Sequence, residues 1–362
     1  MKRFFRTFRR WIQIARATAH EIRPWRRGYW STLRRNVRLC SQRNYQPTEA
    51  RLLELFSPSV SHEDVDRNVN RAELTRIQRR FNPEVLGEMV ANKVLFHSLC
   101  VQAGLSVPRC VLVTQRGKRS WFNFEGANFS TKAQKYAAFD EAFPDEFVIK
   151  PITAASGRGV SCLRREGEGF VDFAGIRVTR EALFERLSLG DRKGWIVQSR
   201  VQNHPALVEL TGCEGLHTFR VKTFVRPDGE AEVLFAFFKL IATPDQISDA
   251  FGRGSTGNLW IPVDVDRGCF SGKAWGGLRE WKQVRVANHP YSGKPLDGFA
   301  IPLFAEVVEL ALRAAREFSQ LRLLAWDIGI TPDAPVLIEG NHFWNAYGYN
   351  RSGRMSELRE LV

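Results

Sequence analysis

The sequence predicts an α+β fold with more than one subdomain, and three observations lead to this prediction. The chain has 362 residues, 44% of them hydrophobic, which is enough for a sizeable core. Residues 46–110 show helical periodicity, whereas 111–350 is dominated by short apolar runs between turn residues. A membrane-spanning helix needs about 18 uninterrupted apolar residues, and even the run "VLFAFFKLIA" contains Lys239. We therefore expect a globular protein.

The positive charge of the chain is concentrated at its N-terminus. The whole chain has a formal charge of +14, but residues 1–45 hold 13 Lys and Arg against one acid, a net +12. The remainder holds 40 basic and 38 acidic residues, a net of only +2. The body therefore lacks the basic excess typical of a specific nucleic-acid binder. Six scattered cysteines without a CxxC pair predict a reduced, cytoplasmic setting without structural zinc.

The basic extension, residues 1–45, begins with an amphipathic helical pattern. An apolar stripe at 4-3-4-4-3 spacing consists of Phe4, Phe8, Trp11, Ala15, Ala19 and Ile22. Basic residues occupy the opposite face of the same helix. Two interpretations stay open, ahead of an organellar transit peptide or a polyanion-binding arm. The stripe could lie in an anionic membrane interface, at the inner face of the membrane, or it could pack on the body of the protein and leave the arginines solvated.

A helical N-terminal part, residues 46–110, follows the extension. It includes "NPEVLGEMVANKVLFHSLCVQAGL", in which Val85, Met89 and Val90 predict a buried face and Gly104 predicts the end of the helix. Residues 111–200 alternate short apolar runs and turns around one helix, which predicts a small α+β unit ending in a hinge at "WIVQSRV". Residues 201–350 predict a larger unit with two hairpins and a long amphipathic helix between them, and 351–362 form a tail.

The last predicted hairpin brings carboxylates together. The strands "LLAWDIGI" and "PVLIEGN" flank the turn "TPDA", so Asp327 should lie opposite Glu339, with Asn341 on the same face. Opposed carboxylates are destabilising unless a cation or a shared proton lies between them. Two acids and an amide oxygen suit magnesium, which takes its remaining ligands from water and phosphate. The alternative is that one of the acids points to solvent.

Lys150 ends the strand in "FVIKPITAASGRGV". The lysine precedes the glycines, so a Walker phosphate loop is absent. The small residues after it, including Ser156, Gly157 and Gly159, would let backbone amides approach an anion. A small-residue loop of this kind is also common in ordinary turns.

A third set of cations lies in the first hairpin of the larger unit. Arg220 and Lys222 share one face of "HTFRVKTF", and Lys239 is in line with Val233, Phe235 and Phe237 on the paired strand. A lysine that points inward among phenylalanines needs an anionic partner or loses its charge. The alternative is a lysine that reaches solvent at the rim of the sheet.

Six motifs, in their order along the chain, resemble the ATP-grasp superfamily. They are "NK" at 92–93, "GLSVPR", "FVIKPITAASGRGV", "WIVQSRV", "TFRVKTF" and "WDIGITPDAPVLIEGN". The resemblance is strongest to the sugar-transfer associated group, which is related to the carboxylate-amine ligases. The resemblance covers about residues 75–345. It implies two α+β subdomains that clamp ATP, with two magnesium ions. On the nucleotide side it implies that Lys93 and Lys150 bind phosphate, that residues 154–160 form a lid with Ser156, Gly157, Gly159 and Val160, and that Gln198, Ser199 and Val201 contact the adenine. It also implies that Asp327, Glu339 and Asn341 bind the metal. Arg220 and Lys239 would supply positive charge near the transferred phosphoryl group.

The sequence also departs from this pattern. Many ligases of the superfamily have an arginine two residues before the first metal acid, where this chain has Ala325, so charge for an acyl phosphate has to come from elsewhere. The segment "HFWNAYGYNRSG" lacks the usual Pro-Gly turn after the second metal strand. The glycine-rich "DAFGRGSTGN", Asp249 to Asn258, is either a substrate loop or a plain connection. Arg158 is expected at the tip of the lid, outside the catalytic set.

The resemblance implies an ATP- and magnesium-dependent ligase. A substrate carboxylate becomes an acyl phosphate that an amine converts to an amide, in the setting of cell-surface polysaccharide or glycoconjugate modification. The sequence shows no credible protein nucleophile, in agreement with attack by a substrate. Two alternatives stay open: kinase-like transfer to a sugar or hydroxyl acceptor, and a non-catalytic nucleotide-binding regulator at the membrane.

Overall fold

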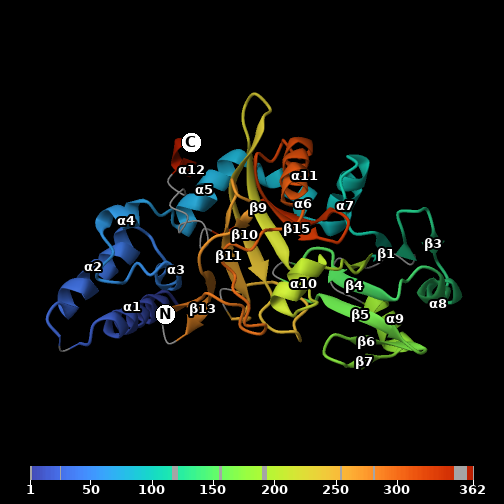
Figure 1. The fold of residues 1–362 in the computed structure, drawn as a ribbon, viewed down its shortest axis with the longest axis horizontal. Helices are drawn as coiled ribbons and strands as arrows, with labels where there is room; N and C mark the ends of the chain where they lie inside the picture. Colours follow the sequence, from blue (N-terminus) through green and yellow to red (C-terminus); the bar gives the residue numbers. More distant parts are fainter. Residues whose placement is uncertain are drawn as a thin grey trace.

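The computed structural model describes residues 2–24, 26–115, 121–154, 157–189, 194–252, 255–279, 282–345 and 357–361. Three regions follow one another across the molecule, as Figure 1 shows: N-terminal helices, a large central sheet and a smaller sheet. The predicted α+β class is confirmed. Within the described ranges, no helix combines the length and apolar character required to span a bilayer.

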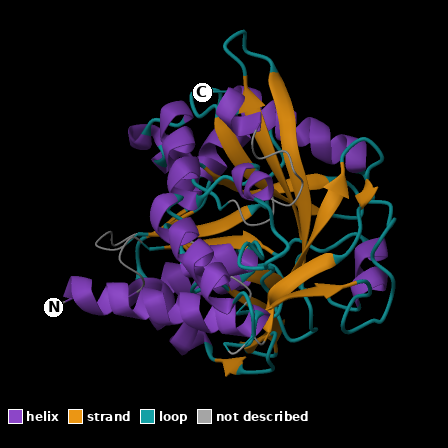
Figure 2. Ribbon diagram, turned by 90° about the vertical axis from the view of Figure 1, so that its left-hand side faces the viewer, coloured by secondary structure: helices purple, strands orange, loops and turns teal. Residues whose placement is uncertain are grey.

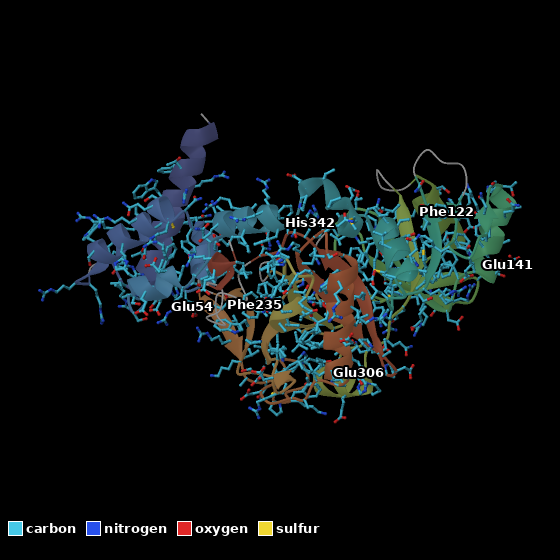
Figure 3. The ribbon with its side chains drawn as sticks, turned by 90° about the horizontal axis from the view of Figure 1, so that it is seen from above. Glu54, Phe122, Glu141, Phe235, Glu306 and His342 are labelled. Atoms are coloured by element: carbon cyan, nitrogen blue, oxygen red, sulfur yellow. The ribbon has the colours of Figure 1, made fainter. Side chains whose placement is uncertain are left out.

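Five helices open the chain, and the first four form a core of their own. These four are α1 (Lys2–Glu21), α2 (Tyr29–Gln42), α3 (Pro47–Leu52) and α4 (His62–Asp66), whereas α5 (Arg71–Phe81) packs against the larger sheet. Apolar side chains of α1, α2, α3 and the segment after α3 pack together, among them Ile14, Leu39, Ala50 and Phe56. The N-terminal end of α1 projects away from this core (Figures 2 and 3).

The buried face of α1 differs from the predicted apolar stripe. Ile14, Ala17 and Thr18 are buried, whereas Phe8 and Trp11 are 55% and 50% exposed. Polar contacts hold the docked face, since Asn36 Nδ2 donates to Thr18 Oγ1 at 2.9 Å and Arg10 donates to Cys40 O in α2 and to Tyr45 O after α2. The helix therefore packs with its second half and leaves Phe8 and Trp11 exposed.

The smaller sheet has eight antiparallel strands in the order β3-β2-β1-β8-β4-β5-β6-β7. They are β1 (Cys110–Thr114), β2 (Trp121–Phe122), β3 (Asn128–Phe129), β4 (Glu146–Pro151), β5 (Ser161–Glu166), β6 (Gly169–Asp172), β7 (Arg177–Val178) and β8 (Trp195–Ser199). Helices α8 (Lys132–Glu141) and α9 (Arg180–Leu189) accompany it. Its core is rich in aromatic rings, with Phe139, Phe147 and Phe170 in edge-to-face contact.

The larger sheet follows the order β14-β13-β11-β10-β9-β15-β16, and β12 pairs with β11. Its strands are β9 (Thr218–Val225), β10 (Ala231–Leu240), β11 (Leu259–Asp264), β12 (Cys269–Phe270), β13 (Ala274–Arg279), β14 (Lys282–Val286), β15 (Leu323–Ile330) and β16 (Pro335–Asn341). Both predicted hairpins, β9–β10 and β15–β16, are confirmed. Helix α11 (Phe304–Glu317) covers one face of this sheet and α10 (Pro205–Thr211) lies near the smaller sheet (Figure 1).

The helical segment before the smaller sheet is interrupted. It consists of the 3-10 turn η1 (Glu84–Leu86), α6 (Glu88–Ala91) and α7 (Lys93–Gln102), in place of one continuous helix. Asn92 causes the break, because its side chain caps α7 by accepting the backbone N–H of Val94 and Leu95. Val85 is 84% exposed, so the prediction that it is buried is wrong, whereas Val90 is buried as expected.

Candidate functional site

A cavity of about 630 Å³ lies between the two sheets and contains most of the predicted site residues. Eleven of them line it: Lys93, Lys150, Gly157, Val160, Ser199, Val201, Arg220, Lys239, Asp327, Glu339 and Asn341. Two others, Gly159 and Gln198, are not among the lining residues of the described part. Ser156 lies outside the described residues.

The larger sheet presents its charged side chains to the cavity in rows. One row runs across four strands as Phe237, Arg220, Asp327 and Glu339, each paired with the next. The predicted opposition of Asp327 and Glu339 is therefore confirmed, but the turn "TPDA" alone does not produce it: a bulge between Asp327 and Ile328 shifts the register by one residue, without which Asp327 would lie opposite Ile338. The next row holds Lys222, Ala325 and Asn341.

Val233 does not share the face of Lys239. A bulge between Val233 and Phe235 shifts the pairing of β10 against β9 by one residue. Val233 consequently packs with the core on the opposite face of the sheet, next to α11, while Phe237 and Lys239 line the cavity. The predicted alignment of Val233 with the lysine is wrong, because a bulge is not visible in the alternation of residue types.

An ion-pair network connects three of these strands. Arg220 donates two hydrogen bonds to Asp327, and its guanidinium lies 3.6 Å from a Glu339 carboxylate oxygen. Lys239 Nζ lies 3.1 Å from Asp327 Oδ2 and 3.0 Å from Asp249 Oδ1. Asp327 is 2% exposed and Lys239 is 7% exposed, so these charges depend on one another rather than on water. The inward lysine thus has the anionic partner that the sequence predicted.

The network shifts the pKa values of the two paired carboxyl groups in opposite directions. Burial alone would raise the pKa of Asp327, but Arg220 and Lys239 outweigh it and hold the pKa well below its usual range. Burial in the cavity and the neighbouring Asp327 raise the pKa of Glu339. Glu339 is therefore the carboxyl group that most needs an added cation or a proton.

The donor set fits a hard cation. Two carboxylates and the Asn341 amide supply oxygen atoms, and Asn341 Nδ2 donates to Glu339 Oε1 at 3.3 Å, so the three groups meet. Among the described residues, no three His, Cys, Asp or Glu side chains are placed so that they could hold a metal ion by themselves. A metal held here would need further ligands from water or phosphate, which is the coordination that magnesium accepts.

The smaller sheet contributes lysines from the opposite wall. Lys150 lies near the end of β4, and burial in the cavity lowers its pKa to about 8. Lys93 opens α7 directly after the Asn92 cap, and its Nζ donates to Ala154 O at 2.6 Å. Burial also lowers the pKa of Lys93. The helix break at Asn92 therefore places a second lysine beside the loop that follows Lys150.

The loop after β4 depends on glycine at two positions. Gly157 and Gly159 have φ of 70° and 74°, a region that favours glycine. A Cβ atom on Gly157 would lie 2.7 Å from Ser248 Oγ, so the loop closely approaches the segment before Asp249. Arg186 donates to Gly159 O at 3.0 Å and fixes the end of the loop to α9. Arg158 is exposed and lines the cavity, as expected for the tip of the loop.

The end of β8 forms the edge of the cavity between the sheets. Ser199 and Val201 line it, whereas Gln198 is buried between β1 and β4. Arg200 lies between Ser199 and Val201 in the sequence, and its Nη1 donates to both carboxylate oxygens of Glu146, each at 2.9 Å. This ion pair fixes the segment that links the two sheets.

Sequence reasoning gave no catalytic or binding role to Asp249 and Thr218. Asp249 is 8% exposed, accepts a hydrogen bond from Thr218 Oγ1 and pairs with Lys239. It opens the glycine-rich "DAFGRGSTGN" segment, and Asn258 Nδ2 holds that segment by donating to Ser248 O at 2.7 Å and Ala250 O at 3.1 Å. The isolated inward Lys239 was the signal that an acid had to lie nearby.

Several solved structures resemble the chain at low sequence identity. Biotin carboxylase from Campylobacter jejuni is 10% identical with a TM-score of 0.43, over 80% of this chain and 50% of that one. L-amino acid ligase from Bacillus licheniformis is 15% identical with a TM-score of 0.38, over 73% and 43%. D-alanine–D-alanine ligase from Bacillus anthracis is 11% identical with a TM-score of 0.38, over 75% and 66%.

The chain spans about half the length of the first of these structures, and similarity at this level supports no statement about activity. No curated protein sequence matches the chain. The family comparison covers a similar share of the chain, since residues 72–359 match the family described as sugar-transfer associated ATP-grasp. That range includes both sheets, all the described lining residues of the cavity except Arg71, and every predicted site residue. The chain therefore belongs to the sugar-transfer associated ATP-grasp family.

Proposed function

We propose that this protein is an ATP- and magnesium-dependent ligase that activates a substrate carboxylate as an acyl phosphate and joins it to an amine. The observation that carries the proposal is the pairing of two unlike walls in one cavity. Lys150 of the smaller sheet and Lys93 of α7 line the cavity on one side. On the other side, the larger sheet presents the row that contains Arg220 and the paired carboxylates Asp327 and Glu339. Membership of an ATP-grasp family supports ATP as the nucleotide.

The proposed nucleotide contacts divide between the two sheets. Lys93 and Lys150 bind phosphate, the loop around Gly157 and Val160 covers it, and the edge at Ser199 and Val201 contacts the adenine. Gln198 supports this edge from inside the smaller sheet, and Gly159 shapes the loop without lining the cavity. Glycine at both loop positions lets backbone amides approach a phosphate closely.

The larger sheet would hold the metal. Asp327, Glu339 and Asn341 provide the oxygen ligands, and magnesium bound there would neutralise charge on the phosphates. Arg220 and Lys239 now bind the same Asp327 carboxylate. Both cations therefore stand close to the phosphoryl group that would be transferred, where preorganised positive charge favours the transition state.

The proposed reaction has two displacements. A carboxylate oxygen of the substrate bonds to the γ-phosphorus, the bond between that phosphorus and the bridging oxygen breaks, and ADP leaves. The amine nitrogen then bonds to the acyl carbon, the carbon–oxygen bond to phosphate breaks, and inorganic phosphate leaves while the amine loses a proton. Such chemistry requires positioning and charge neutralisation more than a protein nucleophile.

Hydroxylamine trapping tests this function. The protein is incubated with ATP, magnesium, hydroxylamine and a panel of carboxylates, with the Lys150→Met variant as the inactive control. We expect a hydroxamate and ADP in equal amounts for at least one acid. ADP with a phosphorylated hydroxyl compound and no hydroxamate would show a kinase. Stabilisation by ATP without turnover of any acid would show a nucleotide-binding regulator and overturn the ligase proposal.

We also propose that the extension binds an anionic membrane surface at its cytoplasmic side, which would bring the enzyme to polysaccharide or glycoconjugate assembly. The supporting observation is the projecting first half of α1, on which Phe8 and Trp11 are half exposed within a stretch of net +12 charge (Figures 2 and 3). Basic residues near an anionic bilayer contribute about 1 kcal/mol each.

Vesicle sedimentation tests the membrane proposal. The intact chain should bind vesicles that contain phosphatidylglycerol more tightly than neutral ones, and Phe8→Ser with Trp11→Ser should weaken binding without affecting nucleotide binding. Ile14→Ser is the matched control, because Ile14 is buried in the α1–α2 core and should affect stability first. Equal binding of the Phe8/Trp11 variant and the unmodified protein would contradict the proposal.

A further inference from the structure

The cavity extends past the predicted nucleotide and metal residues toward helix α5. The described residues that line it there include Arg71 of α5, Phe237 of β10, Trp260 of β11, and Trp344 and Asn345 after β16. Arg71 precedes the range that matches the family, and residues 344–345 belong to the segment that lacks the usual Pro-Gly turn. This end of the cavity therefore has features of its own, apart from the nucleotide half.

The start of α5 fixes the position of Arg71, the first residue of this helix. Asn70 caps the helix, since its side chain accepts the backbone N–H of Glu73 at 3.0 Å. The carboxylate of buried Glu49 accepts the backbone N–H of Arg71 at 2.7 Å. The backbone that carries this arginine is therefore anchored on both sides.

The face of α5 that carries Arg71 is turned toward Trp344. Leu74 and Gln78 follow three and seven residues later, on the same face of the helix. Leu74 is fully buried in the apolar cluster that contains Trp344, and Gln78 Nε2 donates to Trp344 O at 3.1 Å. Arg71 consequently stands one turn before these contacts, at the exposed mouth of the cavity.

The guanidinium of Arg71 pairs with no carboxylate in the described part of the chain. Within the described ranges its side chain forms no hydrogen bond or ion pair, and it acts on Glu49 only from beyond ion-pair distance, opposing the rise that burial causes in the pKa of that carboxyl. The acids of the described lining already pair with cations of the larger sheet, and they are Asp249, Asp327 and Glu339. An anionic group that enters this end can therefore pair with Arg71 without displacing a protein carboxylate.

Aromatic rings line the cavity between Arg71 and Arg220. Phe237 is paired with Arg220 across β10 and β9, and Trp344 lies against the helix face that carries Arg71. The two rings are neighbours, because Lys222 Nζ lies 4.6 Å from the ring centre of Phe237 and 4.9 Å from that of Trp344. We call these rings the aromatic patch, which consists of Phe237, Trp260 and Trp344.

Further aromatic and ionic contacts brace the aromatic patch. The ring centres of Trp260 and Phe237 are 5.6 Å apart, and Trp260 stacks on Trp275 at 5.5 Å. Arg285 lies 4.2 Å from the ring centre of Trp275 and pairs with Glu54 of the N-terminal part. Phe237 is only half-buried, so part of its ring is open to the cavity. Such a surface favours a ligand with a flat ring or an apolar body.

We infer that the acid activated by this enzyme has a ring-sized apolar body and a second anionic group, which Arg71 selects. This inference rests on the proposed ligase function and specifies its acid substrate. The carboxylate to be activated lies near Arg220 and Lys239, and the body packs on the aromatic patch. A phosphate or carboxylate at the far end of the body pairs with Arg71. Arg71 is thus a specificity residue and takes no part in phosphoryl transfer.

Three acids serve as probes of the two features. Benzene-1,4-dicarboxylate has a ring and a second anionic group, benzoate has the ring alone, and hexanedioate has two anionic groups without a ring. Binding to the protein loaded with magnesium and a non-hydrolysable ATP analogue is measured by calorimetry. We expect benzene-1,4-dicarboxylate to bind about tenfold more tightly than either of the others, because only this acid uses both Arg71 and the aromatic patch.

Substitution of Arg71 separates its charge from the rest of the cavity. Arg71→Met should remove the advantage of benzene-1,4-dicarboxylate over benzoate, about tenfold, which is the lower end for a hydrogen bond to a charged group because Arg71 is exposed. Arg71→Lys keeps a charge and should keep part of the advantage. Arg80→Met is the matched control, because Arg80 is also exposed, lies on the opposite side of α5 and is outside the described lining. The affinity for the ATP analogue should stay the same in all variants.

A fourth probe, 4-phosphonobenzoate, tells the two anionic groups apart. Its binding should also depend on Arg71, and the tighter of the two dianionic ring probes identifies the group as phosphate or carboxylate. An equal loss of benzoate and dicarboxylate binding in Arg71→Met, hexanedioate binding as tight as that of the ring acid, or no probe binding by an unmodified chain that binds the analogue would overturn the inference. Failure of the unmodified chain to bind the analogue with magnesium would instead overturn the proposed function.

Discussion

The two walls of the cavity handle charge differently. On the larger sheet, Arg220, Lys239 and Asp327 neutralise one another within hydrogen-bonding distance. On the smaller sheet, Lys150 is buried in the cavity wall, which lowers its pKa to about 8. The wall on the larger sheet holds paired charges before a ligand binds. On the smaller sheet, a bound anion would stabilise the protonated form of Lys150. The difference suggests that one wall is built to hold metal and transferred phosphoryl group, and the other to respond to the nucleotide.

Removing the central carboxylate should have the largest effect on the preorganised wall. Asp327→Asn leaves Arg220 and Lys239 without their shared partner, and breaking a buried ion pair costs about 3–5 kcal/mol. Urea unfolding of the protein without nucleotide measures the free energy of unfolding. Glu209→Gln is the control, because Glu209 pairs with Lys294 at the surface, and it should leave the unfolding curve unchanged. A loss no larger than the control would contradict the network.

Removing Lys150 should produce the opposite pattern on the other wall. Lys150→Met should weaken ATP binding about 10- to 100-fold, since a hydrogen bond to a charged group is worth about 1.5–3 kcal/mol. The protein without nucleotide should be at least as stable as before, because a buried cation is removed. Calorimetry with ATP and urea unfolding measure the two effects. Destabilisation as large as that of Asp327→Asn would show that the walls do not differ.

The lowered pKa of Lys150 gives its wall a pH dependence. Below about pH 8 the lysine is protonated, the form that the proposed phosphate contact requires, and above it the amine is neutral. ATP affinity should therefore stay constant up to pH 8 and fall above it. Lys150→Arg keeps its charge and should show a flat profile from pH 7 to 9.5. A fall of the same size in the arginine variant would assign the pH effect to another group.

Acid should affect the larger sheet through His217, which precedes β9. This histidine is fully buried, and burial lowers its pKa to about 3. The unfolded chain then binds the extra proton below pH 6.5, so stability falls as the pH decreases, by about 2 kcal/mol between pH 6.5 and 5. Urea unfolding at the two pH values measures the change. His217→Asn should remove this part of the pH dependence.

The smallest effect is expected where the two walls meet, at the loop after β4. Gly157→Ala combines an unfavourable positive φ with a contact to Ser248 Oγ, and a left-handed residue with a Cβ costs about 1–2 kcal/mol. We expect ATP affinity to fall about tenfold. Adding Ser248→Ala removes the contact and should recover part of the loss. No recovery would show that φ alone determines the cost.

The same contrast explains which features were predictable from the sequence. The β15–β16 hairpin was predictable from its short turn. The bulge beside Asp327 that brings it opposite Glu339, the bulge in β10 and the cap at Asn92 were not predictable, because each is a local departure from an otherwise regular pattern. The docked face of α1 could not be predicted from the apolar pattern, because polar contacts of Arg10, Thr18 and Asn36 help to hold it. Asp249 could be anticipated only through its partner Lys239.

Isotope transfer tests the central claim most directly. The acid that gives a hydroxamate is prepared with ¹⁸O in its carboxylate and turned over with ATP, magnesium and hydroxylamine. Because one carboxylate oxygen becomes the bridge of the acyl phosphate, the account predicts one ¹⁸O atom in each inorganic phosphate released. Phosphate without ¹⁸O, formed while ATP is consumed, would contradict activation of the carboxylate in this cavity.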